Sequence, residues 1–153
     1  MRLCRPLLSL LPAVVLAGCA SEHASVASVL DDFHDAASKA DEARYFGHLD
    51  ENAVFLGTDA TERWTKDEFL AYAHPHFEAG DGWTFVPIER HIETEGNVAW
   101  FDERLASEHL GECRGTGVLT LEGGRWRLTQ YNLTIPIPND LAREFVARIR
   151  EAE

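Results

Sequence analysis

The sequence predicts an α+β domain in which a strongly curved antiparallel sheet wraps around N-terminal helices to form a cone. Three observations predict this class. Apolar residues recur at helical spacing up to about residue 78, the period changes to two from about residue 83, and turn residues then separate four strands. Helices that cover one side of an antiparallel sheet define an α+β architecture. A sheet bent this strongly would enclose an interior cavity.

The helices are expected in the first half of the chain. The apolar stripe of a first helix, which ends near residue 40, consists of Val26, Val29, Leu30, Phe33 and Ala37. Asp41 can cap a short second helix, and residues 53–57 are expected to form a strand. Thr65 and Glu68 form a capping box, with a threonine at the cap and a glutamate three residues later, which predicts a third helix.

Four longer strands are expected after this helix, at residues 83–95, 98–108, 112–121 and 125–135. Gly123 and Gly124 supply the turn between the last two strands. The stretch "IPIPND" ends the sheet, because proline cannot donate a hydrogen bond to a central ladder. Asn139 is expected to cap a last helix that carries Leu141, Phe145 and Ile149 on one face.

The composition indicates one globular domain. The chain has 153 residues, of which 45% are apolar and 26% are charged, so it is long enough and apolar enough to form one core. The formal net charge of −12, without a clustered lysine and arginine face, disfavours a nucleic-acid partner. No dinucleotide or phosphate-loop motif predicts a cofactor. His74 and His76 without an H-E-x-x-H motif or a cysteine cluster do not predict a metal site.

The N-terminus has the layout of a secretory signal. Arg2 and Arg5 precede an apolar stretch from Leu7 to Leu16 that is too short to span a bilayer, which needs about 20 residues. The stretch "LAGC", which ends at Cys19, resembles the lipobox of bacterial lipoproteins. This resemblance implies cleavage after residue 18 and lipidation of Cys19; plain secretion with an incidental cysteine is the alternative. The expected segments are a signal peptide at 1–18, a lipidated cysteine and tether at 19–25, and one domain at 26–153.

These segments predict a protein of the bacterial cell envelope that is held on the membrane by lipid. In a Gram-negative cell it would lie at the periplasmic face of the outer membrane. Two or more lipid chains give a stable anchor. Once the signal is removed and Cys19 is lipidated, Cys113 is the one remaining thiol, so no intrachain disulfide is possible. We expect Cys113 to be a small buried residue of a strand.

Four stretches resemble a SnoaL-like domain of the nuclear transport factor 2-like superfamily: "VLDDFHDAASKAD", "FLGTDATERW", "RGTGVLTLEGGRW" and "YNLTIPIPND". The resemblance covers about residues 24–142. It implies the cone-shaped roll of that superfamily and of cystatin-like folds. The superfamily includes isomerases, cyclases, dehydratases and ligand-binding modules, so the resemblance implies a fold rather than one reaction.

The stretch "FLGTDATERW" is interpreted as the lip of the cavity. Its apolar half continues a strand, and its polar half would place Asp59, Glu62 and Trp64 near the opening. The resemblance aligns the catalytic aspartate of ketosteroid isomerases with Gly57, which has no side chain, and this leaves Asp59 or Glu62 as the candidate base. Both carboxylates also fit an ordinary solvated loop.

Other polar residues are expected to contribute to the pocket. On the last strand Trp126 and Leu128 should face inward, which would also turn Gln130 and Asn132 toward the cavity. His76 is a candidate for the pocket rim. The even-numbered residues of the neighbouring strands could add polar groups, but the sequence leaves their register open.

Three functions are consistent with these features. The leading hypothesis is a domain that binds a small, partly apolar molecule in the cone, without catalysis. The first alternative is an isomerase, cyclase or dehydratase that uses Asp59 or Glu62 as base. The second alternative is a homodimeric protein-interaction module, which an exposed apolar face on the long strands would favour.

Overall fold

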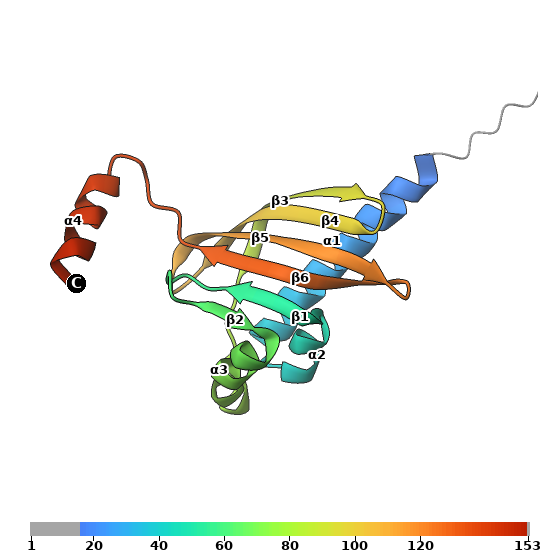
Figure 1. Cartoon of the computed structure of the whole chain (residues 1–153), viewed down its shortest axis with the longest axis horizontal. Coiled ribbons are helices and arrows are strands. Elements are labelled where there is room, and N and C mark those ends of the chain that lie inside the picture. Colours follow the sequence, from blue (N-terminus) through green and yellow to red (C-terminus); the bar gives the residue numbers. More distant parts are fainter. Residues whose placement is uncertain (1–15, 153) are drawn as a thin grey trace, which may run out of the picture.

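The computed structural model describes the backbone of residues 16–152 and the side chains of residues 26–152. The elements in chain order are α1 (Leu16–Ser38), α2 (Glu42–Gly47), β1 (Leu49–Leu56), β2 (Arg63–Thr65), α3 (Lys66–Glu78), β3 (Val86–Glu95), β4 (Val98–Ser107), β5 (Gly111–Glu122), β6 (Arg125–Thr134) and α4 (Ala142–Ala152). One curved, open sheet and its N-terminal helices confirm the predicted α+β class (Figure 1).

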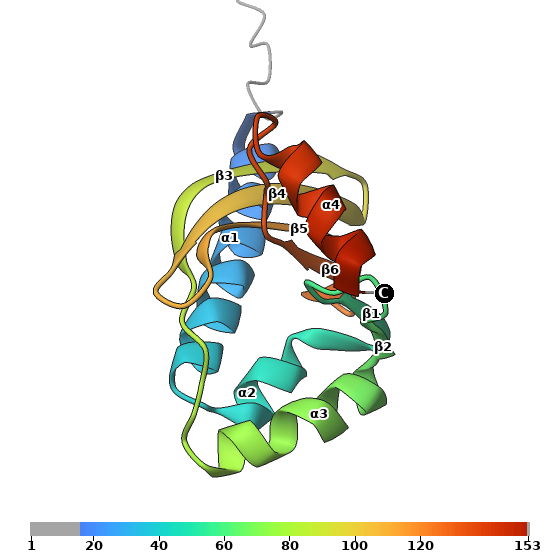
Figure 2. The ribbon, with the colours of Figure 1, turned by 90° about the vertical axis from the view of Figure 1, so that its left-hand side faces the viewer.

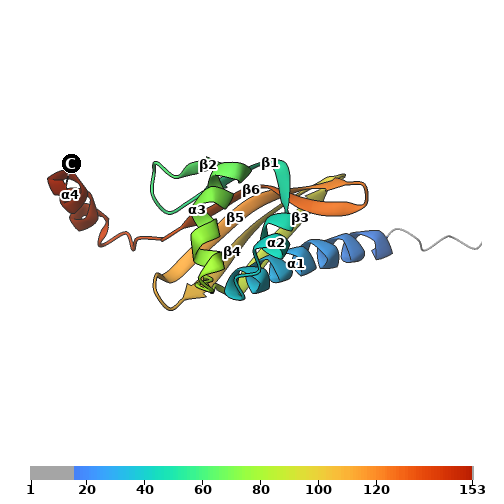
Figure 3. The ribbon, with the colours of Figure 1, turned by 90° about the horizontal axis from the view of Figure 1, so that it is seen from below.

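The sheet has six strands in the order β2-β1-β6-β5-β4-β3. Neighbouring strands are antiparallel, as expected, except for β1 and β6, which run parallel. Parallel neighbours need a long connection, which is supplied here by all the chain from β2 to β5. This pairing brings the first strand beside the last one, and the loop after β1 then lies at one end of the sheet (Figure 3).

Helices α1, α2 and α3 lie on one side of the sheet, and the strands curve around α1 (Figure 2). The predicted stripe of α1 is buried, with Leu30 at 0% and Phe33 at 2% exposure, and it packs toward inward residues such as Leu105 of β4. The predicted capping box starts α3, because the Glu68 N–H donates to the Thr65 hydroxyl and the Thr65 N–H donates to the Glu68 carboxylate. The core therefore fills the space between the three helices and the concave face.

Two boundaries near the N-terminal half differ from the expected ones. α1 begins at Leu16, so the stretch 19–25 that was expected to form a tether is helical and continuous with the domain. Residues 1–15 of the expected signal peptide lie outside the described residues. Arg63–Thr65 form a short strand instead of a loop, because they pair with the end of β1.

The C-terminal helix α4 lies apart from the sheet (Figure 1). Asn139 does not cap it directly, because the backbone turns there and the Leu141 N–H donates to the Pro138 carbonyl before the helix begins. The expected apolar face is present but exposed, with Phe145 at 44% and Ile149 at 54% exposure. Within the part of the chain that the structure describes, no helix is long and apolar enough to cross a membrane.

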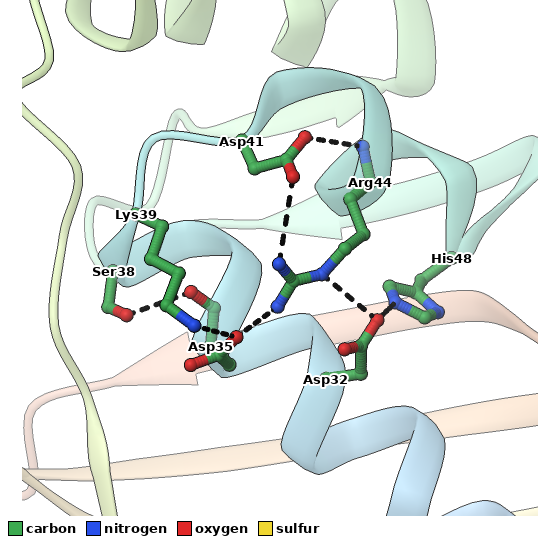
Figure 4. A network of polar contacts seen from close by, with 7 residues as sticks. All are labelled: Asp32, Asp35, Ser38, Lys39, Asp41, Arg44 and His48. Carbon is green, nitrogen blue, oxygen red and sulfur yellow. Dashed lines mark hydrogen bonds and ion pairs between the residues drawn. The ribbon is translucent and has the colours of Figure 1, made fainter.

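A surface network around Arg44 joins α1 to α2 (Figure 4). The Arg44 guanidinium donates to the carboxylates of Asp32 and Asp35 on α1, and it lies 3.6 Å from the carboxylate of Asp41, the N-cap of α2. Hydrogen bonds from Lys39 and Arg44 hold the pKa of Asp35 below its ordinary value. The network therefore sets the angle of α2 against α1, and α2 carries part of the cavity wall described below.

Replacement of Arg44 by methionine is expected to lower Tm slightly, and less so at high salt. The substitution keeps an unbranched side chain but removes the charge, so the loss is electrostatic and is reduced by salt screening. Thermal unfolding at low and high NaCl measures the effect. Arg125→Met is the matched control, at an exposed arginine for which no ion pair is recorded within residues 26–152. An equal fall in Tm for both variants would contradict the role given to the network.

Candidate functional site

A cavity of about 200 Å³ opens between the helices and the concave face of the sheet. Most of its wall is aromatic. Buried rings come from α1, α2, β1, α3 and β6: Phe33, Tyr45, Phe55, Phe69 and Tyr131. More exposed rings are those of Trp64, Tyr72, Trp83 and Phe85. A wall of this composition suits a small and largely apolar molecule.

The rings of the wall support one another. Phe55 and Phe69 stack with centroids 3.8 Å apart, and Trp64 and Tyr72 stack at 4.9 Å. Phe69 and Tyr72 are three residues apart on α3, so they share one face of that helix and meet β1 and β2 together. The aromatic wall is therefore a packed structure rather than a set of separate side chains.

The loop after β1 places Glu62 at the cavity. The chain folds back on itself, since the Gly57 N–H donates to the Glu62 carbonyl at 3.0 Å and the Glu62 N–H donates to the Asp59 carbonyl at 3.0 Å. The Asp59 N–H donates to Oε2 of Glu62, also at 3.0 Å. These bonds orient the Glu62 side chain, which lines the cavity together with Thr58 and Trp64.

Asp59, the other candidate base, is turned into the loop. Its carboxylate accepts hydrogen bonds from the Thr61 hydroxyl at 2.6 Å and from the Thr61 N–H at 2.8 Å. These bonds hold the pKa of Asp59 below its ordinary value. Asp59 is exposed and does not line the cavity. Its geometry is that of an aspartate that stabilises a turn, and Glu62 is the carboxylate of this loop that reaches the cavity.

Gly57 makes room for the Glu62 carboxylate. A Cβ atom at position 57 would lie 2.2 Å from Oε2 of Glu62. The carboxylate therefore occupies the space that a side chain at position 57 would take. This is the position with which the resemblance to ketosteroid isomerases aligns a catalytic aspartate. The fold-back of the loop thus supplies an acidic group where the linear sequence has none.

The inner wall carries a buried histidine–glutamate pair that sequence analysis missed. His34 of α1 lines the cavity at 6% exposure, and Glu103 of β4 is fully buried. Nε2 of His34 lies 2.7 Å from Oε1 of Glu103. The Tyr131 hydroxyl donates to the same oxygen at 3.5 Å. A Cβ atom at Gly115 would lie 2.8 Å from that oxygen, so the glycine keeps the space open.

Arg90 of β3 balances the charge of Glu103. Its Nε donates to Oε2 of Glu103 at 2.7 Å, and its Nη1 donates to Asp31 at 2.7 Å. Burial alone would raise the pKa of Glu103, but the hydrogen bonds and charges of His34 and Arg90 outweigh burial and hold that pKa below its ordinary value. Burial and the nearby Glu103 charge raise the pKa of Tyr131, which therefore stays protonated. The Glu103 carboxylate accepts a hydrogen bond from Nε2 of His34, so Nδ1 is the ring nitrogen that is not bound to Glu103.

The predicted inward orientation of Gln130 and Asn132 is wrong. The ladder between β5 and β6 skips Thr129, which is left as a β-bulge. The extra residue reverses which side chains face inward, so Tyr131 and Leu133 line the cavity. Gln130 is exposed and Asn132 is half-buried on the outer face of the sheet.

The remaining predicted pocket residues divide between the wall and the surface. Trp64 of β2 lines the cavity, as Glu62 does. His76 is exposed on α3 and does not line it. The ring of His76 lies 5.5 Å from that of Tyr72, centroid to centroid, so His76 lies beside the opening and behind a lining residue.

The sequence does carry a signal for the missed pair. His34 comes one helical turn after Leu30, on the buried stripe of α1. Glu103 lies between Phe101 and Leu105 in the inward phase of β4, and glutamate is almost never fully buried unless it is paired. The even-numbered residues of β4, which the sequence left open as polar pocket residues, face outward.

The family comparison agrees with the fold. A family model described as a SnoaL-like domain matches residues 26–138. No curated protein matches the chain. Among solved structures, a protein of unknown function from Mycobacterium tuberculosis has 16% identity and a TM-score of 0.68, and the alignment covers 85% of this chain and 81% of that protein.

Two similar structures have names that suggest enzymes. A candidate dehydratase of the NTF2-like family from Streptomyces avermitilis has 11% identity and a TM-score of 0.67, with 78% of this chain and 99% of that chain covered. A candidate ketosteroid isomerase from Shewanella frigidimarina has 23% identity and a TM-score of 0.56, with 71% and 94% covered. At these identities the likeness shows the fold alone. Since the family model spans most of the described domain and the fold agrees with it, the chain belongs to the SnoaL-like domain family.

Proposed function

We propose that the cavity binds a small, largely apolar molecule. The observation that carries this proposal is a mainly aromatic wall with few polar groups, among them Thr58 and Glu62 from the loop after β1 and His34 and Tyr131 inside. Small-molecule sites generally combine an apolar wall with a few placed polar groups that fix orientation. In this cavity the rings supply the contact area, and the polar groups select the orientation of the ligand.

A blocked opening tests ligand binding. Trp64 and Trp83 both line the cavity, so entry of a ligand from a library of small apolar fragments should change tryptophan fluorescence. Thr58→Phe, at an exposed residue that lines the cavity, should weaken binding of each hit at least about tenfold. Ala60→Phe adds the same ring at an exposed neighbour outside the cavity and should leave binding unchanged. Equal affinities of the two variants would contradict the proposal.

The His34–Glu103 pair favours proton transfer as a second candidate function. His34 and the Glu62 carboxylate line one apolar cavity. Such groups let an isomerase take a proton from one carbon and return it to another, or let a dehydratase take a proton from carbon and protonate the hydroxyl that leaves as water. Glu103 would orient His34, and Nδ1 of His34 or the carboxylate of Glu62 would act as base. The names of the two enzyme-like neighbours support this reaction class.

Conversion of a β,γ-unsaturated cyclohexenone to its conjugated isomer tests proton transfer, because absorbance follows the product directly. Turnover should fall by about 10²–10⁴-fold in the variant that lacks the operating base, His34→Gln or Glu62→Gln. Glu122→Gln removes an exposed carboxylate at the β5–β6 turn and should have no effect. A wild-type rate no higher than that of the His34→Gln/Glu62→Gln double variant would exclude this reaction for the cavity.

A lipid anchor at Cys19 and a homodimer are also part of the proposal. The anchor is supported by the signal layout and by the "LAGC" stretch. The homodimer is supported by the exposed apolar side chains of Val98 and Trp100 on the outer face of β4. The mass of the mature protein tests the anchor, and sedimentation tests the dimer. An unmodified Cys19 or a monomer at high concentration would contradict the respective claim.

A further inference from the structure

The charges around the cavity are unevenly distributed. Within residues 26–152, no lysine or arginine lines it, whereas the Glu62 carboxylate does. The carboxylate of Asp59 lies in the same loop, and the whole chain has a formal net charge of −12. Arg90, a half-buried arginine of β3, is bound to Glu103 and Asp31. Arg63, the residue after Glu62, is exposed and does not line the cavity. An acidic group without a lining cation should favour positive groups at the opening.

Glu62 is held in place without a positive partner. Its carboxylate is half-buried, accepts the Asp59 N–H at 3.0 Å and lies over Gly57. Within residues 26–152 it forms no ion pair. Burial of a carboxylate is unfavourable unless it is paired. An oriented and unpaired carboxylate at the edge of an apolar cavity is thus suited to accept a positive group from a ligand.

The aromatic wall adds to this preference. Trp64 and Tyr72 stack on each other and line the same cavity as Glu62, and Trp83 lines it from the segment before β3. Cations are attracted to the electron-rich faces of aromatic rings, most strongly to tryptophan, and the attraction grows where water is excluded. Anions gain nothing from these faces and are repelled by the Glu62 carboxylate.

Building on the ligand-binding function proposed above, we propose that the ligand carries a positive charge. It is a small apolar molecule with a quaternary or protonated amine. The ammonium group lies near Glu62 and the rings of Trp64 and Tyr72, and the apolar remainder fills the inner wall. A neutral molecule of the same shape would gain the apolar contacts but neither the ion pair nor the cation–π attraction.

Three probes of similar shape and different charge test this assignment. They are choline, its neutral carbon isostere neohexanol, and the tert-butylacetate anion, each titrated into the protein with tryptophan fluorescence as the readout. Choline is expected to bind at least about tenfold more tightly than neohexanol, and the anion more weakly than both. Added NaCl should weaken the binding of choline and leave the binding of neohexanol unchanged, because salt screens only the interactions of the charged group.

A matched pair of variants locates the charge effect. Glu62→Gln keeps an acceptor for the Asp59 N–H but removes the charge. The variant should therefore bind choline only as tightly as it binds neohexanol. Glu122→Gln removes the same charge at the β5–β6 turn, at the other end of the sheet (Figure 1), and should leave choline binding as in wild type.

The outcomes separate this inference from the function on which it rests. Neohexanol that binds as tightly as choline, or a choline affinity that is unchanged in Glu62→Gln, would overturn the proposal that the ligand is positively charged. Either result would still be consistent with a cavity for apolar ligands. Binding of all three probes that persists in Thr58→Phe would place them outside the cavity and overturn both. Failure of all three probes to bind would overturn the inference of an amine ligand. The fragment screen would then be the test of whether the cavity binds apolar molecules.

Discussion

Replacement of Glu103 by alanine is expected to lower the free energy of unfolding by about 3–5 kcal/mol. Glu103 is fully buried, and its two oxygens hold the side chains of His34 and Arg90, each at 2.7 Å. The Arg90 side chain is only 11% exposed, and without Glu103 its guanidinium loses the buried carboxylate that balances its charge. Urea unfolding followed by far-UV circular dichroism measures the loss. Asp102→Ala, at the exposed neighbour on β4, is the control and should be near neutral.

The same group should make stability depend on pH. Because the folded-state pKa of Glu103 lies below its ordinary value of 4.5, its stabilising contribution is complete above that value and is lost as pH falls through the folded pKa. The gap in unfolding free energy between wild type and Glu103→Gln should therefore be constant near neutral pH and shrink below about pH 4.5. A gap that widens in acid would show that Glu103 is not ionised in the folded protein.

Replacement of Gly117 by alanine is expected to lower the free energy of unfolding by about 1–3 kcal/mol. A Cβ atom there would lie 2.4 Å from the backbone oxygen of Gln130 and 2.8 Å from the ring of Phe101, and the backbone of a paired strand cannot move aside without loss of its ladder. Gly47→Ala is the matched control, since nothing lies within 4 Å of its Cβ position. It should be neutral or stabilising by up to about 1 kcal/mol. Equal effects at both glycines would contradict the close packing seen at β5.

Gly117 also bears on the cavity. It pairs with Tyr131, whose ring lines the cavity, and its contact Phe101 belongs to the same inner face. A shift of β6 in Gly117→Ala would therefore move the wall. Ligand affinity of this variant should fall together with stability, whereas Gly47→Ala should retain wild-type binding.

Local features of the sequence predicted most of the secondary structure. The Thr65–Glu68 capping box, the stripe of α1 and the alternating strands depend on residues a few positions apart, and the structure has each of them. The loop stretch "FLGTDATERW" was predicted to form the lip of the cavity, and of its three candidate residues Glu62 and Trp64 line the cavity whereas Asp59 does not. The sequence could not distinguish Glu62 from Asp59, since the distinction depends on which carboxylate the folded turn uses internally.

The linear chain alone determined the resemblance to the family and the order of the helices and of all strands but β2. Periodicity, capping and turn residues act over one or two turns of backbone, so they are visible in the sequence. The tertiary structure alone decided which polar groups meet inside. A bulge at Thr129 reversed the faces of β6, the Gly57 turn brought Glu62 inward, and α1 against β4 joined His34 to Glu103. Each of these depends on register between distant segments, which is set by packing of the whole core rather than by neighbouring residues.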